Sequence, residues 1–181
     1  MESKLVTKTK PAIRLTTTSY ALLALLDQLG APATSYDIKQ ALDKSIENFW
    51  PVPHTTAYEE PARLAAGGYL SVAQEPAGRR RKSYSLTDEG REALAAWAAE
   101  PSAAPPQLRD ELMLKVFAGA DPTALTDARV EWHRAKLEEL RGYLGQVREA
   151  DGWERSERTL IAGVAFHEMM LGLLENLRSQ A

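Results

Sequence analysis

The stretch that decides the fold is FWPVPHTTAYEEPARLAAGGYLSVAQEPAGRRRKSYSL, at residues 49–86. Thr56 is a good N-cap residue, and with Glu59 it has the S/T-x-x-E spacing of a capping box. The spacing predicts a helix over residues 56–66, which the glycines at 67–68 would end because glycine readily takes the left-handed conformation. A short helix with a defined start and end is therefore predicted here.

Two short strands are predicted after this helix, because apolar and small polar residues alternate over 70–73 and again over 83–86. The residues between them, 75–78, suit a turn with proline at its second position. Four positive charges, Arg79, Arg80, Arg81 and Lys82, therefore lie at a hairpin tip, where they can reach a polyanion. The alternative is a solvated run of charge in a loop. A helix followed by a basic hairpin is the order of a recognition helix and a wing, and it favours nucleic acid.

The amino-acid composition limits the classes of protein to which the chain can belong. The chain has 181 residues, 44% of them hydrophobic and 26% charged, which is ordinary for a soluble protein. It has no cysteine, which excludes disulfides and thiolate metal sites and is compatible with a reducing cytoplasm. No apolar run approaches the roughly 18 residues of a membrane span, and the N-terminus MESKLVTKTK lacks the apolar core of a signal peptide. These features predict a cytoplasmic protein without a membrane partner.

The formal net charge of −3 is unusual for a DNA-binding protein, so its distribution matters. Residues 1–100 hold 12 Lys and Arg against 12 Asp and Glu, and residues 101–181 hold 10 against 13. The acidic excess lies in the C-terminal part, while basic residues cluster at both ends of the N-terminal part. Local clusters set the field that a nearby phosphate feels within a Debye length of about 10 Å.

The N-terminal half reads as a flexible basic arm over residues 1–15 and a winged helix-turn-helix domain over 16–100. A leucine-rich helix over residues 20–28 closes at Gly30, and a second begins at Thr34 or Ser35 and runs to about residue 47. Phe49 and Trp50 are expected in the core. Thr87 can cap a further helix with an acidic first turn.

The C-terminal half begins with a proline-rich linker over residues 101–108 and continues as a helical domain over 109–181. A short helix is predicted to end at Gly119, and a long one runs from about residue 121 to 149 with a coiled-coil-like seam. The seam is Val130, His133, Leu137, Leu140, Leu144 and Val147. A last helix, from a capping box at 151–154 to about residue 178, is apolar on more than one face. Such a helix needs cover on several sides, which predicts a homodimer.

This pattern resembles the PadR family of transcriptional regulators over roughly residues 19–117. The matching segments are SYALL at 19–23, YDIK at 36–39, FWP at 49–51, HTTAY at 54–58, RL at 63–64, GYL at 68–70, GRRRK at 78–82, YSLTDEG at 84–90 and RDELMLK at 109–115. The resemblance implies a mainly helical fold with a small β-hairpin wing, and a C-terminal pair of antiparallel helices. It also implies a dimer that binds double-stranded DNA with an inverted repeat, as a repressor that a small aromatic effector releases.

Candidate DNA contacts follow from this reading. Residues on or beside the recognition helix are proposed to contact the duplex: Thr55, Thr56, Tyr58 and Arg63. The wing is proposed to bind phosphate or the minor groove through Arg79, Arg80, Arg81 and Lys82. The resemblance also implies that two residues of the preceding helix, Tyr36 and Lys39, fix the register on the DNA backbone. Glu59 either caps the helix or accepts a hydrogen bond from cytosine.

One departure from the family is Pro61, which stands where an apolar helix-forming residue is usual. As the fifth residue of a helix capped at Thr56, it predicts a kink or a tighter first turn. His54 is expected to be structural or to face phosphate, because no second ligand stands at metal spacing.

Aromatic, histidine and methionine side chains in the C-terminal helices form a candidate effector pocket, because adaptable methionines beside aromatics suit a small aromatic ligand. The candidates are Trp132, His133, Trp153, Phe166, His167 and Met170. The alternative is a dimer core in which both histidines have hydrogen-bond partners.

The chain shows no sequence pattern of an enzyme. Its three histidines are widely spaced, and it has neither a nucleophile elbow, a phosphate-binding loop nor a dinucleotide fingerprint. We therefore expect neither catalysis nor a metal or cofactor. The rival from another class is a protein-interaction module with a helical dimer scaffold, which would bind no DNA sequence specifically.

Overall fold

The computed structural model describes residues 13–46, 49–76, 80–103, 105–149 and 154–180. The chain divides into two compact units, residues 1–102 (unit 1) and residues 103–181 (unit 2). Helices dominate both units, and the described strands all lie in unit 1. The predicted class, mainly helical with a small sheet, is confirmed.

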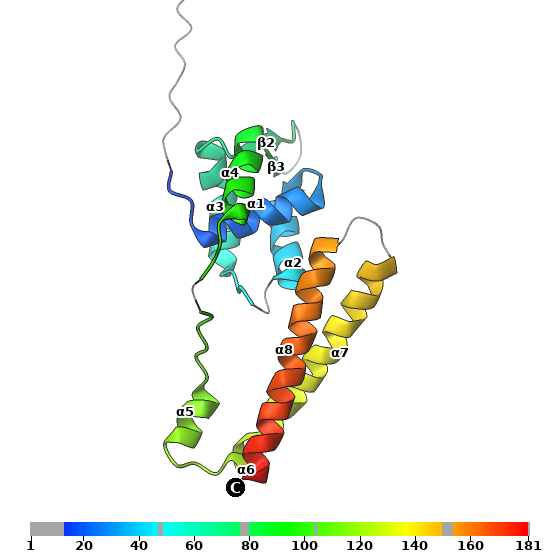
Figure 1. Cartoon of the computed structure of the whole chain (residues 1–181). Helices are drawn as coiled ribbons and strands as arrows, with labels where there is room; N and C mark the ends of the chain where they lie inside the picture. The colour runs from blue at the N-terminus through cyan, green and yellow to red at the C-terminus, as the bar shows by residue number, and fades with distance from the viewer. Residues whose placement is uncertain (1–12, 47–48, 77–79, 104, 150–153, 181) are drawn as a thin grey trace, which may run out of the picture. The chain divides into compact units, whose positions relative to one another are not determined.

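Unit 1 combines helices with a small antiparallel sheet, two strands of which lie beside α4 in Figure 1. The strand order is β1-β3-β2, and β3 pairs with both neighbours. The elements in chain order are α1 (Thr17–Leu29), β1 (Ala33–Thr34), α2 (Ser35–Ser45), α3 (His54–Ala66), β2 (Leu70–Gln74), β3 (Lys82–Leu86) and α4 (Asp88–Ala99).

Threonine side chains begin three of these helices. Thr16 and Thr34 each form a capping box, with Ser19 and Asp37 respectively, so that the orphan N–H groups of the first turn are satisfied. Thr87 accepts a hydrogen bond from the Gly90 N–H at 3.1 Å, as predicted. Gly30 ends α1 with φ 61°, the left-handed conformation that its position requires.

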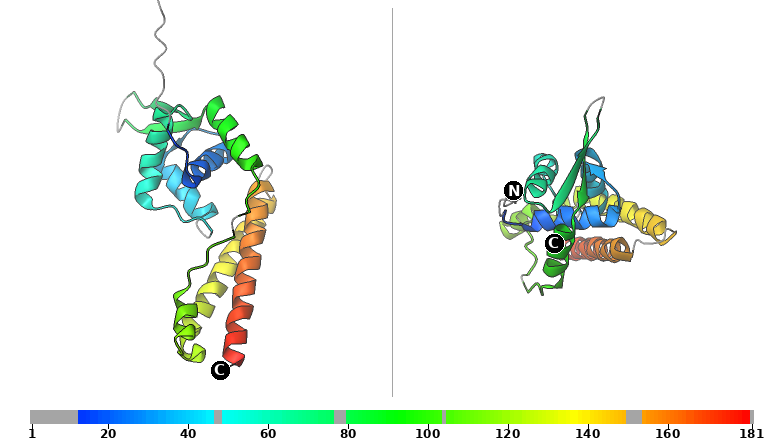
Figure 2. Two further views of the ribbon diagram at one scale, coloured as in Figure 1. Left: turned by 60° about the vertical axis from the view of Figure 1, so that its left-hand side comes forward. Right: turned by 90° about the horizontal axis from the view of Figure 1, so that it is seen from above.

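The predicted hairpin is confirmed. Strands β2 and β3 pair from Leu70 opposite Leu86 to Gln74 opposite Lys82, and the hairpin extends away from the helices of unit 1 (Figure 2). The short strand β1, which the sequence did not predict, pairs Ala33 with Tyr84. It escapes prediction because two residues are too few to show an alternation.

Two expectations about the approach to α3 are wrong. The helix begins at His54, after Pro53, and has no side-chain cap, so Thr56 and Glu59 do not form a capping box. Phe49 and Trp50 are 56% and 40% exposed, and are not core residues. Pro53, with φ −55°, already has a backbone suited to lead into a helix, so the helix starts directly after it.

The core of unit 1 is built mainly from the leucines of α1 and one face each of α2, α3 and the sheet. Leu22, Leu23, Ile38, Ala57 and Leu64 are fully buried. Burial of this apolar surface holds the helices against the sheet and leaves the opposite face of α3 outside.

Unit 2 contains α5 (Glu111–Phe117), α6 (Pro122–Leu125), α7 (Asp127–Glu149) and α8 (Glu154–Ser179). Helices α7 and α8 pack along each other (Figure 2). The long helix predicted from residue 121 is divided at Thr126, whose buried hydroxyl donates to the Pro122 carbonyl at 2.9 Å and accepts from the Arg178 guanidinium. The cap predicted at residue 151 lies outside the described residues.

The predicted seam of α7 is confirmed from Val130 through His133, Leu137 and Leu140 to Leu144, which are all buried, while its last member, Val147, is half-buried. They pack mainly against α8 and partly against α5. Contrary to the expectation from sequence, α8 is long and apolar enough, by length and composition alone, to cross a membrane, with a mean hydropathy of 1.3. Only 22% of its apolar window is buried within the protomer. Such a helix is also common in the core of a soluble protein.

Candidate nucleic-acid interface

The outward face of α3 carries polar and aromatic side chains. Residues 54, 55, 58, 59 and 62 recur at helical spacing and are all exposed, whereas Ala57, Glu60, Pro61 and Leu64 are buried. The His54 ring stacks on Tyr58 with centroids 4.7 Å apart. Of the predicted contacts on this helix, Thr55 and Tyr58 are therefore exposed, and Thr56 is half-buried.

The wing presents exposed positive charge. Arg80, Arg81 and Lys82 are exposed, and none of their side chains forms a salt bridge with another described residue. Backbone hydrogen bonds hold the hairpin, since the Arg81 carbonyl accepts from the Glu75 N–H at 3.0 Å. Arg80 has φ 49°, a left-handed conformation that a tight turn demands. Arg79 lies outside the described residues.

Helix α2 places its first turn near the wing. Its capping residue Thr34 donates hydrogen bonds from its hydroxyl and backbone N–H to the Asp37 carboxylate, which lowers the pKa of Asp37, and the charge of Arg81 lowers it further. Tyr36 is 59% exposed and its hydroxyl accepts a hydrogen bond from Gln40. Lys39 is less available, because its ammonium forms a salt bridge with Asp43.

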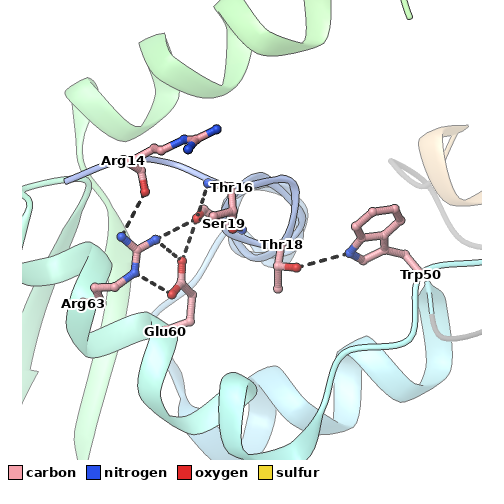
Figure 3. A network of polar contacts seen from close by, with 7 residues as sticks. All are labelled: Arg14, Thr16, Thr18, Ser19, Trp50, Glu60 and Arg63. Carbon is pink, nitrogen blue, oxygen red and sulfur yellow. Dashed lines mark hydrogen bonds and ion pairs between the residues drawn. The ribbon is translucent and has the colours of Figure 1, made fainter. Parts of the chain in front are cut away.

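Arg63 lies in a different place from the other predicted contacts. Its guanidinium faces α1 and the segment before it, where it donates to the Glu60 carboxylate, the Ser19 hydroxyl and the Arg14 carbonyl (Figure 3). Sequence reasoning missed Ser19, Glu60 and Arg14 as members of one site. The available signals were the i,i+3 spacing of Glu60 and Arg63 and a serine within an apolar helix.

Most of the candidate effector residues lie close to one another in unit 2. His133 of α7 and His167 of α8 are buried, with their Nδ1 atoms 2.8 Å apart, and the rings of Trp132 and Phe166 lie beside them. Met170 is 98% buried on the same helix as His167. Trp153 lies outside the described residues.

The two imidazoles are held in their neutral form. Burial, the neighbouring His167 and Arg129 lower the pKa of His133 to about 4, against a smaller opposite effect of Asp110. Burial and Lys136 lower the pKa of His167, while Glu139 acts in the opposite direction. Within the described part of the chain, the Nε2 atom of His133 has no hydrogen-bond partner.

Helix-turn-helix geometry followed by a basic wing defines unit 1 as a winged helix-turn-helix domain. Residues 22–96 match the transcriptional regulator PadR-like family. The chain is 28% identical, over 130 residues, to the negative transcriptional regulator PadR of Bacillus subtilis (strain 168). The match covers 68% of this chain and 70% of that protein.

Solved structures show the same fold. One is Bacillus subtilis PadR in complex with operator DNA, with a TM-score of 0.77 and 22% identity over 91% of this chain and 99% of that chain. Another is the same protein in complex with p-coumaric acid, with a TM-score of 0.72 and 21% identity over 91% and 98%. Residues 22–96 of the N-terminal unit therefore match the PadR-like family of transcriptional regulators, and the chain as a whole is similar to PadR regulators.

Proposed function

We propose that this protein is a sequence-specific DNA-binding repressor that acts as a cytoplasmic homodimer. The observation that carries the proposal is the outward face of α3, which no core contact occupies, together with the exposed charges of the wing. An exposed helix face can read base edges in a major groove, and basic side chains beside it can bind phosphate. The operator-bound relative supports this assignment.

In this proposal Thr55, Thr56 and Tyr58 approach the bases and Tyr36 approaches the backbone. The wing contributes Arg79 to Lys82, and Lys39 can contribute only if it leaves Asp43. Glu59, which is exposed and does not cap its helix, stays a candidate acceptor for a cytosine amino group.

Helix α8 supports the homodimer. Its side chains Ile161, Phe166, Met169 and Leu173 are 44%, 39%, 61% and 37% exposed. The last three recur at spacings of three and four, so they form one apolar stripe of the helix. A second copy would remove this apolar stripe from water. A twofold dimer would also present two α3 helices to a palindromic site.

The proposed effector site is the pair of buried imidazoles between the rings of Trp132 and Phe166. The unpartnered Nε2 atom of His133 could hydrogen-bond a phenol or carboxylate, and the two partly exposed rings could stack on an aromatic ligand. The relative bound to p-coumaric acid makes this acid the first probe. Quenching of tryptophan fluorescence that Trp132→Phe abolishes and Trp97→Phe leaves intact would support the site.

Selection of bound duplexes from a random pool tests the central proposal. Recovery of an inverted repeat that binds far more tightly than random duplex is the expected result. A pool without enrichment would favour the rival class, a protein-interaction module.

The wing is tested by the salt dependence of binding. Replacing Arg80, Arg81 and Lys82 with alanine should make the slope of log K against log salt less negative, by about 0.9 for each lost phosphate contact. Arg134→Ala, an exposed arginine of unit 2, is the matched control. A triple variant with the wild-type slope would remove the wing from the footprint.

A further inference from the structure

Glu60 is a buried carboxylate within the proposed recognition helix. Its side chain accepts hydrogen bonds from Ser19 Oγ at 2.7 Å and from Arg63 Nε and Nη2 at 2.7 and 2.6 Å (Figure 3). Burial alone would raise the pKa of Glu60, but the hydrogen bonds from Arg63 and Ser19 and the charge of Arg63 lower it on balance. The carboxylate is therefore ionised and held from two sides.

The Arg63 guanidinium is almost fully used within the fold. Two of its hydrogen bonds go to Glu60, one to Ser19 at 2.9 Å and one to the Arg14 carbonyl at 3.0 Å. A guanidinium fork has five N–H donors, so these four bonds leave one. A phosphate could not take the usual bidentate pair without breaking this arrangement.

Ser19 joins the two helices. Its hydroxyl donates to Glu60 and accepts from Arg63 Nη2 and from the Thr16 N–H at 2.8 Å, which uses its one donor and both lone pairs. The same serine belongs to the capping box that begins α1. We name these residues, Thr16, Ser19, Glu60, Arg63 and the Arg14 carbonyl, the α1–α3 network.

A second attachment lies one residue away on α1. The Trp50 indole N–H, in the segment that leads into α3, donates to the Thr18 hydroxyl at 3.4 Å (Figure 3). The entry to α3 and its middle are thus both attached to the start of α1. Two attachment points restrict rotation of α3 about its own axis.

Helix α3 depends on such support, because its own backbone bonding is incomplete. It has no side-chain cap, and Pro61 inside it has no N–H to donate to the preceding turn. A small rotation would move Tyr58 and Thr55 relative to base edges while leaving the exposed wing charges in place.

We propose that Ser19, Glu60 and Arg63 are positioning residues that set the outward face of α3 and therefore sequence discrimination. This inference rests on the proposed function. It assigns Arg63 to recognition through the orientation of α3, in place of a direct phosphate contact.

Lysine at position 63 distinguishes the two roles. Arg63→Lys keeps the charge that a phosphate contact needs but cannot make the forked bonds to Glu60 and the further bonds to Ser19 and Arg14. Binding of the selected duplex and of random duplex is measured for the wild type, Arg63→Lys, Arg63→Met and Ser19→Ala across a range of salt. Arg134→Lys, which makes the same exchange at an exposed arginine of unit 2, is the control.

The positioning role predicts that Arg63→Lys, Arg63→Met and Ser19→Ala each reduce the ratio of selected to random affinity by at least about 10-fold, since lost base readout costs this much. Their salt slopes should stay at the wild-type value, and Arg134→Lys should change neither quantity. Wild-type discrimination in Arg63→Lys would overturn the inference. So would a slope that becomes less negative by about 0.9 in Arg63→Met while the affinity ratio stays unchanged.

Amide chemical shifts without DNA provide the readout that is independent of the proposed function. Ser19→Ala and Arg63→Lys should shift the amides of residues 54–66 while the signals of β2 and β3 persist, which shows a fold that is retained. Unshifted α3 amides would refute the positioning role. A wild type that prefers no duplex would refute the proposed function alone, and the amide shifts would still decide the role of the network.

Discussion

Lowering the pH from 7 to 5 is expected to destabilise unit 2, because two buried imidazoles face each other between α7 and α8. The Nδ1 atoms of His133 and His167 share one hydrogen bond, so only one of the two can carry a proton there. Charging both rings would place two like charges in contact in the core. The groups around them are Arg129, Lys136, Glu139 and Asp110.

The magnitude follows from proton linkage. A histidine with a pKa of 6.5 in the unfolded chain and about 4 in the fold binds its proton in the unfolded state first. The stability that it contributes is present above pH 6.5 and is lost as the pH falls toward 4. His133 alone then accounts for a loss of about 2 kcal/mol by pH 5. His167, whose pKa is also lowered, acts in the same direction.

Urea unfolding of the full chain at fixed protein concentration, followed by circular dichroism between pH 7 and pH 5, measures this loss. A double variant with His133→Leu and His167→Leu should reduce the pH dependence, because replacing both partners leaves no titrating group. A second double variant with glutamine at both positions keeps polar groups there. His54→Gln, which removes the exposed histidine of unit 1, is the matched control.

Either of two results would contradict the predicted role of the two histidines. One is a wild-type unfolding free energy that stays constant from pH 7 to pH 5. The other is an undiminished fall in both double variants, which would assign the acid sensitivity to carboxylates elsewhere.

Three further changes test the packing. Gly90→Ala should destabilise unit 1 by about 1–3 kcal/mol in thermal unfolding, because its Cβ would lie 2.2 Å from the Tyr69 carbonyl oxygen, whereas Gly142→Ala has open space and should not destabilise. Leu174→Ala, at a fully buried position, should cost about 2–5 kcal/mol in urea unfolding; a change below the lower figure would contradict the assigned core. Thr87→Ala should cost about 1 kcal/mol by calorimetry, since it removes the cap of α4, and an unchanged melting temperature would argue against that cap.

Local chemistry explains what could be predicted from sequence. The hairpin follows from alternation over residues 70–73 and 83–86, and the end of α1 follows from Gly30. The seam of α7 follows from its spacing of three and four. Each of these signals lies within a few residues of the feature that it predicts.

Most of what could not be predicted depends on contacts between distant residues. Trp50 looks like a core residue in sequence, but it lies at the surface with its indole N–H on Thr18, 32 residues away. The bonding of Arg63 within the fold was also not predictable, because its partners Ser19 and Arg14 are 44 and 49 residues away. Thr56 fits a capping pattern, but Pro53 begins the helix earlier.

The division of α3 into two faces has a consequence for evolution and engineering. Residues 54, 55, 58, 59 and 62 point away from the core, while Glu60 and Leu64 hold the helix in place. Substitutions on the first set can accumulate at little cost in stability. If α3 reads the operator as proposed, operator preference can therefore diverge, or be redirected by randomising these five positions, on a scaffold that keeps its architecture.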